Sequence, residues 1–302
     1  MGLQMSVILA YLDTTIWNVL CDQAVEASKL TNDLAAQSAQ LVLGTNAVYE
    51  LAKTFRGSRT AAPQRAVKLF SFLKPYVQLG IPLLRQTDDL LREEAKHAAK
   101  EIRYVELFYG SEDYKKLVAE TEKLAQGNFD SRAAQFMPLR EAEAKQSRYD
   151  LAAHIEGQPD LIRKLKAIPD SEVARWIERE VKGRGARRIL AAHLAQVIKG
   201  PPLRDLTWLA KQLLASQRFK VSHALVRSDL YLNWRYCQVG TLGKDSIDDN
   251  YHGVNAGYCD LFVTADPGLA AYMSHVLTRT RVGLYDRTVP VGKWLVAICG
   301  HS

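Results

Sequence analysis

The strongest constraint on the fold is a change of pattern along the chain. Near the start, two apolar runs, SVILAYL and QLVLG, are each followed by a segment with helical apolar spacing. Near the end, the helical segment PGLAAYMSHVL lies between the short apolar runs DLFVTAD and TRVGLYD. Strands that alternate with helices favour a parallel sheet with helices on its faces. The pattern therefore predicts an α/β fold.

The middle of the chain has a different texture. From about Thr87 to Phe219 the apolar residues recur at helical spacing, and no segment has a convincing strand pattern. We therefore predict one α/β core interrupted by a large all-helical insertion. The predicted core comprises residues 1–84 and 228–302, and the predicted insertion comprises residues 85–227.

Composition excludes several classes of protein. The 302 residues are 47% hydrophobic, which rules out wholesale disorder. No apolar run approaches the roughly 20 residues of a membrane span, and the start lacks the features of a signal peptide. The four cysteines include no C-x-x-C pair, so we predict free thiols rather than a disulfide framework or a zinc site. The expected location is cytoplasmic, without a membrane partner.

Positive charge is concentrated in one part of the chain. The formal net charge is +7, and residues 181–227 carry ten basic side chains against one aspartate. A local excess of this kind attracts phosphates. The segment KGRGARR is the candidate contact with nucleic acid, through Lys182, Arg184, Arg187 and Arg188; the alternative is an ordinary turn between helices. Trp176 and Trp208 offer either stacking surfaces or core packing.

Three carboxylates are predicted to meet at one edge of the sheet. Asp13 closes the first apolar run and Asp266 closes the run LFVTAD. Because parallel strands end at the same edge, both side chains should lie where the active sites of open α/β folds are found. Pro267 supports an extended Asp266 followed by a helix start. Glu50 lies in the helix after the second run, from which its side chain can return to that edge.

Further acids could join them. Asp248 and Asp249 begin the segment DDNYHGVNAGYC, and Asp260 lies between that segment and Asp266. Clustered carboxylates repel one another and usually need a cation, and oxygen ligands favour Mg²⁺ or Mn²⁺. The alternative is ordinary capping, with Asp248 at a helix start and Asp260 in a turn.

These residues resemble the PIN-domain nuclease superfamily. The resemblance rests on YLDTTIW, on the NAVYEL segment and above all on DNYHGVNAGYCDLFVTAD, and it leaves the helical insertion unexplained. It implies a PIN-like sheet and a divalent-metal site formed by Asp13, Glu50, Asp249 and Asp266. It also implies that Asp260 assists and that the Thr264 hydroxyl positions substrate or water.

Some positions are less well defined by the resemblance. His252 follows Asp249 by three residues and is expected to be a structural or supporting histidine rather than a substrate contact. Thr15 stands where many relatives have asparagine. Asp248 replaces Asp249 if the register is shifted by one residue.

The motifs of other enzymes are missing from the sequence. It contains no Walker loop, no G-x-G-x-x-G after the first run, no H-E-x-x-H and no G-x-S-x-G. The expected function is a divalent-metal-dependent endonuclease, a ribonuclease more than a deoxyribonuclease, with RNA as partner and Mg²⁺ or Mn²⁺ as cofactor. The rival is a catalytically silent PIN-like module that binds nucleic acid or protein, and a third reading is an unrelated metal-dependent phosphatase. A homo-oligomer or a regulatory protein partner is left open.

Overall fold

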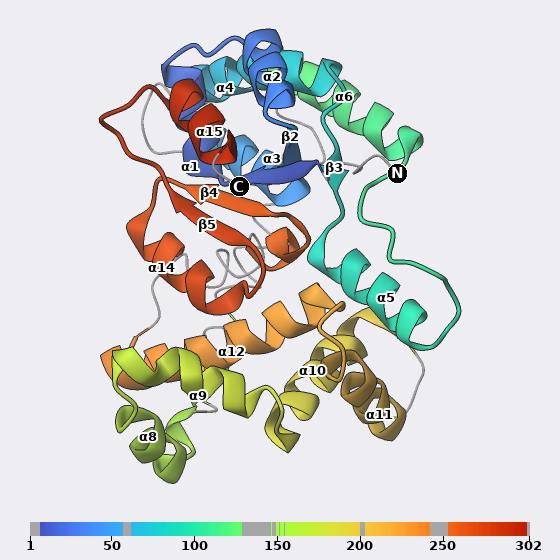
Figure 1. Ribbon diagram of the computed structural model, residues 1–302, viewed down its shortest axis with the longest axis vertical. Helices are drawn as coiled ribbons and strands as arrows, with labels where there is room; N and C mark the ends of the chain where they lie inside the picture. Colours follow the sequence, from blue (N-terminus) through green and yellow to red (C-terminus); the bar gives the residue numbers. More distant parts are fainter. Residues whose placement is uncertain are drawn as a thin grey trace.

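The structure is a computed structural model in which five parallel strands form one sheet in the order β3-β2-β1-β4-β5 (Figure 1). It describes residues 7–56, 62–128, 146, 149–150, 152–153, 155–199, 203–241 and 253–300. The strands are β1 (Ile8–Leu12), β2 (Ala39–Gly44), β3 (Leu83–Leu84), β4 (Leu261–Thr264) and β5 (Arg281–Leu284).

The two ends of the chain share this sheet. β1 pairs with β2 on one side and with β4 on the other, and Ala10 lies opposite Leu261. The predicted α/β class and the parallel sheet built from both ends are therefore confirmed. β3 was not predicted, because two residues are too few to show a periodicity.

The first face of the sheet packs against a layer of helices that lies at the top of Figure 1. Ala10 and Leu12 of β1 belong to this core, together with Trp17 and Phe70 from the helices. The elements on this side are α1 (Thr14–Asp22), α2 (Ala27–Ala36), α3 (Thr45–Lys53), η1 (Thr54–Arg56), α4 (Ala62–Gln78), α6 (Ser111–Ala125) and α15 (Val291–Gly300).

The second face packs against the helices in the lower half of Figure 1. Tyr11, between Ala10 and Leu12 in β1, points to this side and stacks on Phe262 of β4 with ring centroids 5.8 Å apart. This alternation is the two-residue period of a strand. The elements here are α5 (Thr87–Ala98), α8 (Pro159–Lys166), η2 (Asp170–Glu172), α9 (Val173–Glu180), α10 (Arg184–Val197), α11 (Leu203–Leu214), α12 (Lys220–Val239), η3 (Ala256–Tyr258) and α14 (Pro267–Val276).

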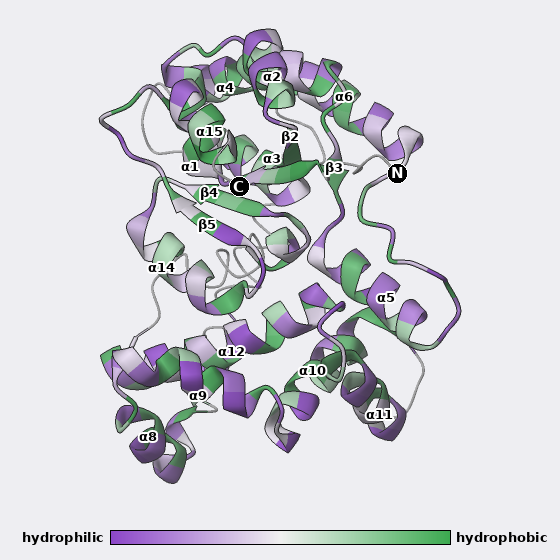
Figure 2. Cartoon of the chain, viewed as in Figure 1, coloured by the Kyte–Doolittle hydropathy of each residue, from purple (hydrophilic) through white to green (hydrophobic). Residues whose placement is uncertain are grey.

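Hydropathy follows this layering. In Figure 2, β2 and β4 are largely green, and the helices that cover the sheet mix green and purple. α12 is the most deeply buried of the lower helices, since its residues from Val221 to Ser228 are all buried.

The predicted insertion is not a separate all-helical body in the described residues. Its α6 packs against α4 on the first face, whereas α5 and α9–α12 pack on the second. The predicted boundary between residues 227 and 228 falls inside the continuous helix α12. Leu84 and Phe108 also form an isolated antiparallel bridge. The described helices of this segment therefore complete both layers of the core.

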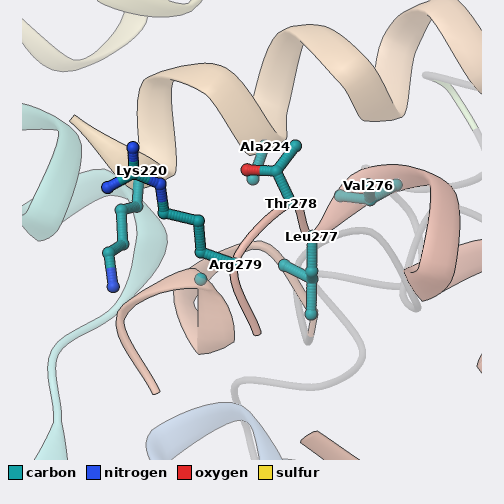
Figure 3. Close-up of a pocket in the computed structure, with 7 residues that line it drawn as sticks. Lys220, Ala224, Val276, Leu277, Thr278 and Arg279 are labelled. Atoms are coloured by element: carbon teal, nitrogen blue, oxygen red, sulfur yellow. The ribbon is translucent and has the colours of Figure 1, made fainter. Parts of the chain in front are cut away.

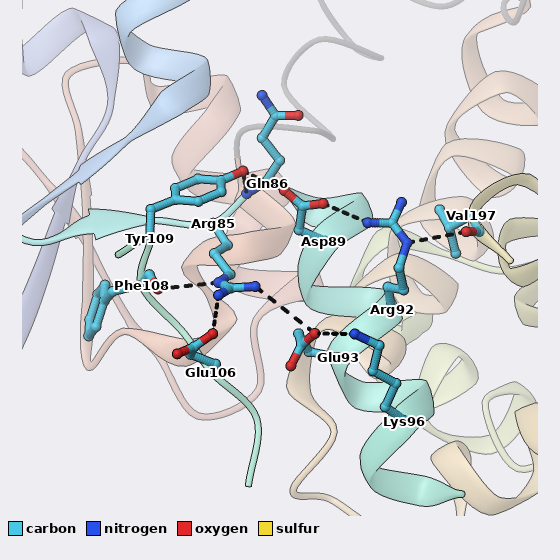
Figure 4. A network of polar contacts seen from close by, with 10 residues as sticks. All are labelled: Arg85, Gln86, Asp89, Arg92, Glu93, Lys96, Glu106, Phe108, Tyr109 and Val197. Atoms are coloured by element: carbon cyan, nitrogen blue, oxygen red, sulfur yellow. Dashed lines mark hydrogen bonds and ion pairs between the residues drawn. The ribbon is translucent and has the colours of Figure 1, made fainter. Parts of the chain in front are cut away.

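A polar network fixes α5 to the chain that follows it (Figure 4). Asp89 accepts hydrogen bonds from Tyr109 Oη at 2.5 Å and from Arg92 Nη1 at 2.7 Å. Arg92 Nε donates to the Val197 carbonyl at the end of α10, at 3.3 Å. On the sheet side, Arg85 Nε donates to the Phe108 carbonyl. These contacts tie α5 to both the edge of the sheet and α10.

A buried carboxylate anchors the start of α12. Glu94 of α5 is completely buried and accepts hydrogen bonds from Val221 N and Ser222 N at 2.8 Å, from Ser222 Oγ at 2.5 Å and from Tyr258 Oη at 2.6 Å. The free N–H groups at a helix start are thereby satisfied by a side chain from another helix. Burial outweighs these hydrogen bonds and raises the pKa of Glu94 to about 7.

Two predictions from composition can be compared with the structure. All four cysteines are free, as predicted, and all four are buried. Among the described helices, none is both long enough and apolar enough to cross a bilayer.

Candidate acidic site

Three of the predicted carboxylates line one pocket at the carboxyl edge of the sheet. Asp13 directly follows β1, Asp266 follows β4 by two residues, and Glu50 projects from α3, which begins where β2 ends. The pocket has a volume of about 300 Å³ and is lined by Asp13, Thr14, Thr15, Asn18, Glu50, Lys53, Asp266 and Leu269. The prediction that Asp13, Glu50 and Asp266 converge is therefore confirmed.

Asp13 is the most tightly held of the three. It is 3% exposed and caps the start of α1, where its Oδ2 accepts a hydrogen bond from Thr15 N at 3.2 Å. The same oxygen accepts hydrogen bonds from Thr15 Oγ1 at 2.6 Å and Thr264 Oγ1 at 3.0 Å. Within the described residues, every group that contacts Oδ2 at hydrogen-bond distance is a neutral donor, and Asp13 forms no ion pair. One of these hydroxyls comes from the first turn of α1 and the other from the last residue of β4.

Thr14 connects two of the carboxylates. Its Oγ1 lies 2.5 Å from Glu50 Oε2 and 3.2 Å from Asp13 Oδ1. A threonine hydroxyl has one proton to donate, so it cannot satisfy both oxygens at once. The arrangement brings the two carboxylates close together on either side of a single hydroxyl.

Asp266 and Thr264 close the site from the β4 side. Asp266 caps α14, because its Oδ1 accepts hydrogen bonds from Gly268 N at 2.7 Å and Leu269 N at 3.1 Å. Its side chain is otherwise exposed, and no described residue contacts its Oδ2 at hydrogen-bond distance. Thr264 is fully buried and accepts a hydrogen bond from Asp266 N at 3.0 Å while donating to Asp13. In this structure Thr264 therefore orients Asp13 rather than facing the pocket.

Asp260 is not part of this cluster. It precedes β4, whereas Asp266 follows it, so the two acids lie at opposite edges of the sheet. Its Oδ2 accepts a hydrogen bond from Leu9 N at 2.9 Å and its own N donates to the Leu9 carbonyl, also at 2.9 Å. Asp260 thus extends the pairing of β4 with β1. The expectation that it assists a metal at the carboxyl edge is wrong, because four strand residues separate it from that edge.

Three predicted residues lie outside the described part of the chain. They are Asp248, Asp249 and His252. Helical structure resumes at Gly253, and η3 then leads into β4. The choice between Asp248 and Asp249, and the place of His252, stay predictions.

The donor chemistry of the pocket is that of a hard divalent cation. Asp13, Glu50 and Asp266 supply carboxylate oxygens, and Mg²⁺ and Mn²⁺ prefer oxygen ligands. Among the described residues, however, no three His, Cys, Asp or Glu side chains form a group compact enough to hold a metal. The three acids therefore line a common pocket without forming a closed ligand cage.

Several lining residues were missed in the sequence, among them Thr14, Asn18 and Lys53. Lys53 follows Glu50 by one helical turn in α3, and Asn18 follows Thr14 by one turn in α1, where its Nδ2 donates to the Thr14 carbonyl at 2.9 Å. Lys53 lies at helical spacing from the predicted Glu50, and Thr14 directly follows the predicted Asp13; these spacings were the signal that could have found them. Lys53 brings a cation to the rim of the acidic pocket.

The predicted basic residues cluster where α9 passes into α10. Lys182 precedes the Gly183 cap, and Arg184, Arg187 and Arg188 lie in the first turns of α10. We call these four residues the α10 basic cluster. Lys182, Arg184 and Arg188 are exposed, and none of the four forms an ion pair within the described residues. The site is a helix-to-helix turn, as the alternative interpretation expected, and its four cations have no partner in the part of the chain that the structure describes.

A second, much smaller pocket lies at the opposite edge of the sheet (Figure 3). It has a volume of about 10 Å³, and the side chains of Lys220 and Arg279 lie beside it. Such a volume is close to the minimum for a single water molecule. This pocket is therefore too small to hold a substrate.

Comparisons with known proteins add no relative. No family model matches the chain, no curated protein is similar to it, and no solved structure matches its fold.

Proposed function

We propose that this protein is a PIN-like, divalent-metal-dependent nuclease that acts on RNA in preference to DNA. One observation carries the proposal: the buried Asp13 and the acids Glu50 and Asp266 come from separate segments and line one pocket at the carboxyl edge of a parallel sheet. That edge is the usual place for the active site of an open α/β fold.

The residues of the pocket suggest how the site would work. Asp13, Glu50 and Asp266, with Asp249 as the fourth proposed ligand, would hold Mg²⁺ or Mn²⁺. A divalent cation there would supply an activated water and stabilise the charge that develops on a phosphodiester. Thr15 and Thr264 fix the Asp13 carboxylate through its Oδ2, so that its Oδ1 faces Thr14 and Glu50. Lys53, which lines the same pocket, would contact a phosphate of the substrate.

The basic surface supports a nucleic-acid substrate. The α10 basic cluster consists of unpaired cations within the described residues, and phosphate contacts supply most of the affinity for nucleic acid. We propose that this cluster contacts the backbone of the substrate.

The test is incubation with labelled single-stranded RNA, structured RNA and DNA in Mg²⁺, Mn²⁺ or EDTA. The proposal expects cleavage of RNA in either metal and none in EDTA. Equal cleavage in EDTA would remove the metal from the mechanism, and cleavage of DNA alone would reverse the substrate preference.

The second candidate is a catalytically silent module that binds nucleic acid. The observation in its favour is that the three described acids do not form a compact ligand group. Binding of RNA without cleavage in any metal, by protein that contains no bound inhibitor, would favour this candidate.

A further inference from the structure

The outer face of α11 carries an exposed tryptophan. Trp208 is 57% exposed, whereas Leu206, Ala210 and Leu213 of the same helix are buried in the second core. The sequence left open whether Trp208 and Trp176 pack in the core. Trp176 is partly buried against the hydrophobic clusters, whereas the Trp208 side chain is mostly exposed. An indole left in water on an otherwise well-packed amphipathic helix has a large apolar surface without a partner.

Cations flank this indole. Arg204 lies one turn before Trp208 and Lys211 one turn after it, and helical spacing places both on the same side of the indole. Both are exposed, and neither forms an ion pair or hydrogen bond within the described residues. Asp205 is the acid on this turn and lies on the other side of Trp208, in the first turn of the helix, where negative charge is favourable. One edge of the aromatic surface is therefore positive.

The α10 basic cluster belongs to the same pair of helices. α10 and α11 pack against each other, and Figure 1 shows them side by side. Trp208 lies at the middle of α11 and Lys211 lies in its second half. Cations thus occur on both helices of the pair.

We propose that the outer face of α11, formed by Arg204, Trp208 and Lys211, is a stacking platform for single-stranded nucleic acid. The inference deepens the proposed function, on which it rests, by naming the form of the substrate. An unpaired base stacks on the indole, while Arg204 and Lys211 contact the adjoining phosphates. Bases in a duplex are stacked on one another and cannot use this surface. The platform is therefore selective for single strands and tolerant of sequence.

The experiment measures binding in EDTA, so that cleavage plays no part. Fluorescence anisotropy of labelled single-stranded RNA, and of the same RNA as a duplex, is recorded with the full chain at several salt concentrations. Trp208→Ala should weaken single-strand binding by about 5- to 150-fold, the range that loss of one base–aromatic stack gives, and should leave duplex binding nearly unchanged. Trp208→Phe should restore most of the affinity. Replacing both Arg204 and Lys211 with glutamine should lower the slope of log affinity against log salt by about 1.4, from two lost phosphate contacts.

Matched controls come from other surfaces. Tyr104→Ala removes an aromatic residue that is 74% exposed outside α11, and Lys115→Gln with Lys116→Gln removes two exposed cations of α6. Both should leave single-strand affinity unchanged. Because Trp208 is exposed, Trp208→Ala should keep the urea midpoint of the parent.

Unchanged single-strand affinity in a folded Trp208→Ala protein would overturn the platform, as would an equal loss for single strand and duplex. The outcome is separable from that of the nuclease proposal. Binding that depends on Trp208 without cleavage in any metal supports the platform and removes the nuclease. Cleavage that requires Asp13, together with RNA affinity that is unchanged in Trp208→Ala, supports the nuclease and removes the platform.

Discussion

Replacement of Asp13 separates its chemical role from its structural one. In Asp13→Asn the amide oxygen can take the place of Oδ2 and accept from Thr15 N, Thr15 Oγ1 and Thr264 Oγ1. The amide nitrogen then faces Thr14 Oγ1, which can accept its hydrogen bond while donating to Glu50. All three donors to Oδ2 and one of the two amide N–H groups keep a partner, so the free energy of unfolding should change by no more than about 1 kcal/mol, the value of one neutral hydrogen bond.

Asp13→Ala gives the contrasting result. It removes the cap of α1, worth about 1 kcal/mol, and the acceptor of two threonine hydroxyls, worth about 1 kcal/mol each. The hydroxyls of Thr15 and Thr264 lie 3.3 Å apart and can recover one hydrogen bond between themselves. The expected loss is therefore about 2–3 kcal/mol.

Two assays on the same proteins test this reasoning. Urea denaturation followed by tryptophan fluorescence gives the free energies of unfolding, and cleavage of labelled RNA in Mn²⁺ gives the activity. Both variants should lose cleavage, but only Asp13→Ala should lose much stability. Equal destabilisation by asparagine and alanine would refute the hydrogen-bond assignment, and cleavage by folded Asp13→Asn would refute the proposed role of the carboxylate.

Three further predictions concern other parts of the molecule. Replacing all four residues of the α10 basic cluster with glutamine should lower the slope of log affinity against log salt by about 3 in titrations with single-stranded RNA. An unchanged slope would show that the cluster is a turn between helices that does not contact nucleic acid. The pKa of Glu94 is raised to about 7 in the folded protein, whereas the unfolded chain releases this proton near pH 4.5. The protonated Glu94 side chain therefore contributes fully to the free energy of unfolding below about pH 4.5, and this contribution is lost as the pH rises through about 7. Urea midpoints against pH should show this fall, and Glu94→Gln should remove it; an equal fall in the variant would assign it elsewhere. Gly44→Ala should destabilise the fold by about 1–3 kcal/mol, because the added Cβ would overlap with the Tyr11 hydroxyl. An unchanged urea midpoint would show that the Tyr11 side chain moves aside without cost.

The sheet and two of its acids could be predicted because their signals are local. Asp13 and Asp266 each close an apolar run, and parallel strands must bring such positions to one edge. Asp260 has a similar setting in the sequence, but it precedes its strand and so lies at the opposite edge. The distinction between the start and the end of a strand was available in the sequence, whereas the clustering of acids along the chain was misleading.

Other features depend on packing that no local pattern encodes. α12 runs through the predicted boundary because Glu94 of α5 anchors its start and the second core buries its length. The shared Thr14 hydroxyl requires α1 and α3 to place Asp13 and Glu50 side by side, although 36 positions separate Thr14 from Glu50. Such contacts follow from the packed arrangement of helices rather than from the period of any one segment.

The central claim is that Asp13, Glu50 and Asp266 together hold a divalent cation, and calorimetric titration with Mn²⁺ tests it most directly. The parent protein, prepared without metal, should bind Mn²⁺. Asp13→Asn and Asp266→Asn should each weaken or abolish that binding while the fold is retained. The control variant Lys115→Gln changes a residue of α6 that does not line the pocket, and it should bind Mn²⁺ as the parent does. Mn²⁺ binding with the same affinity and stoichiometry in the parent and in a folded protein that carries both aspartate substitutions would contradict the account.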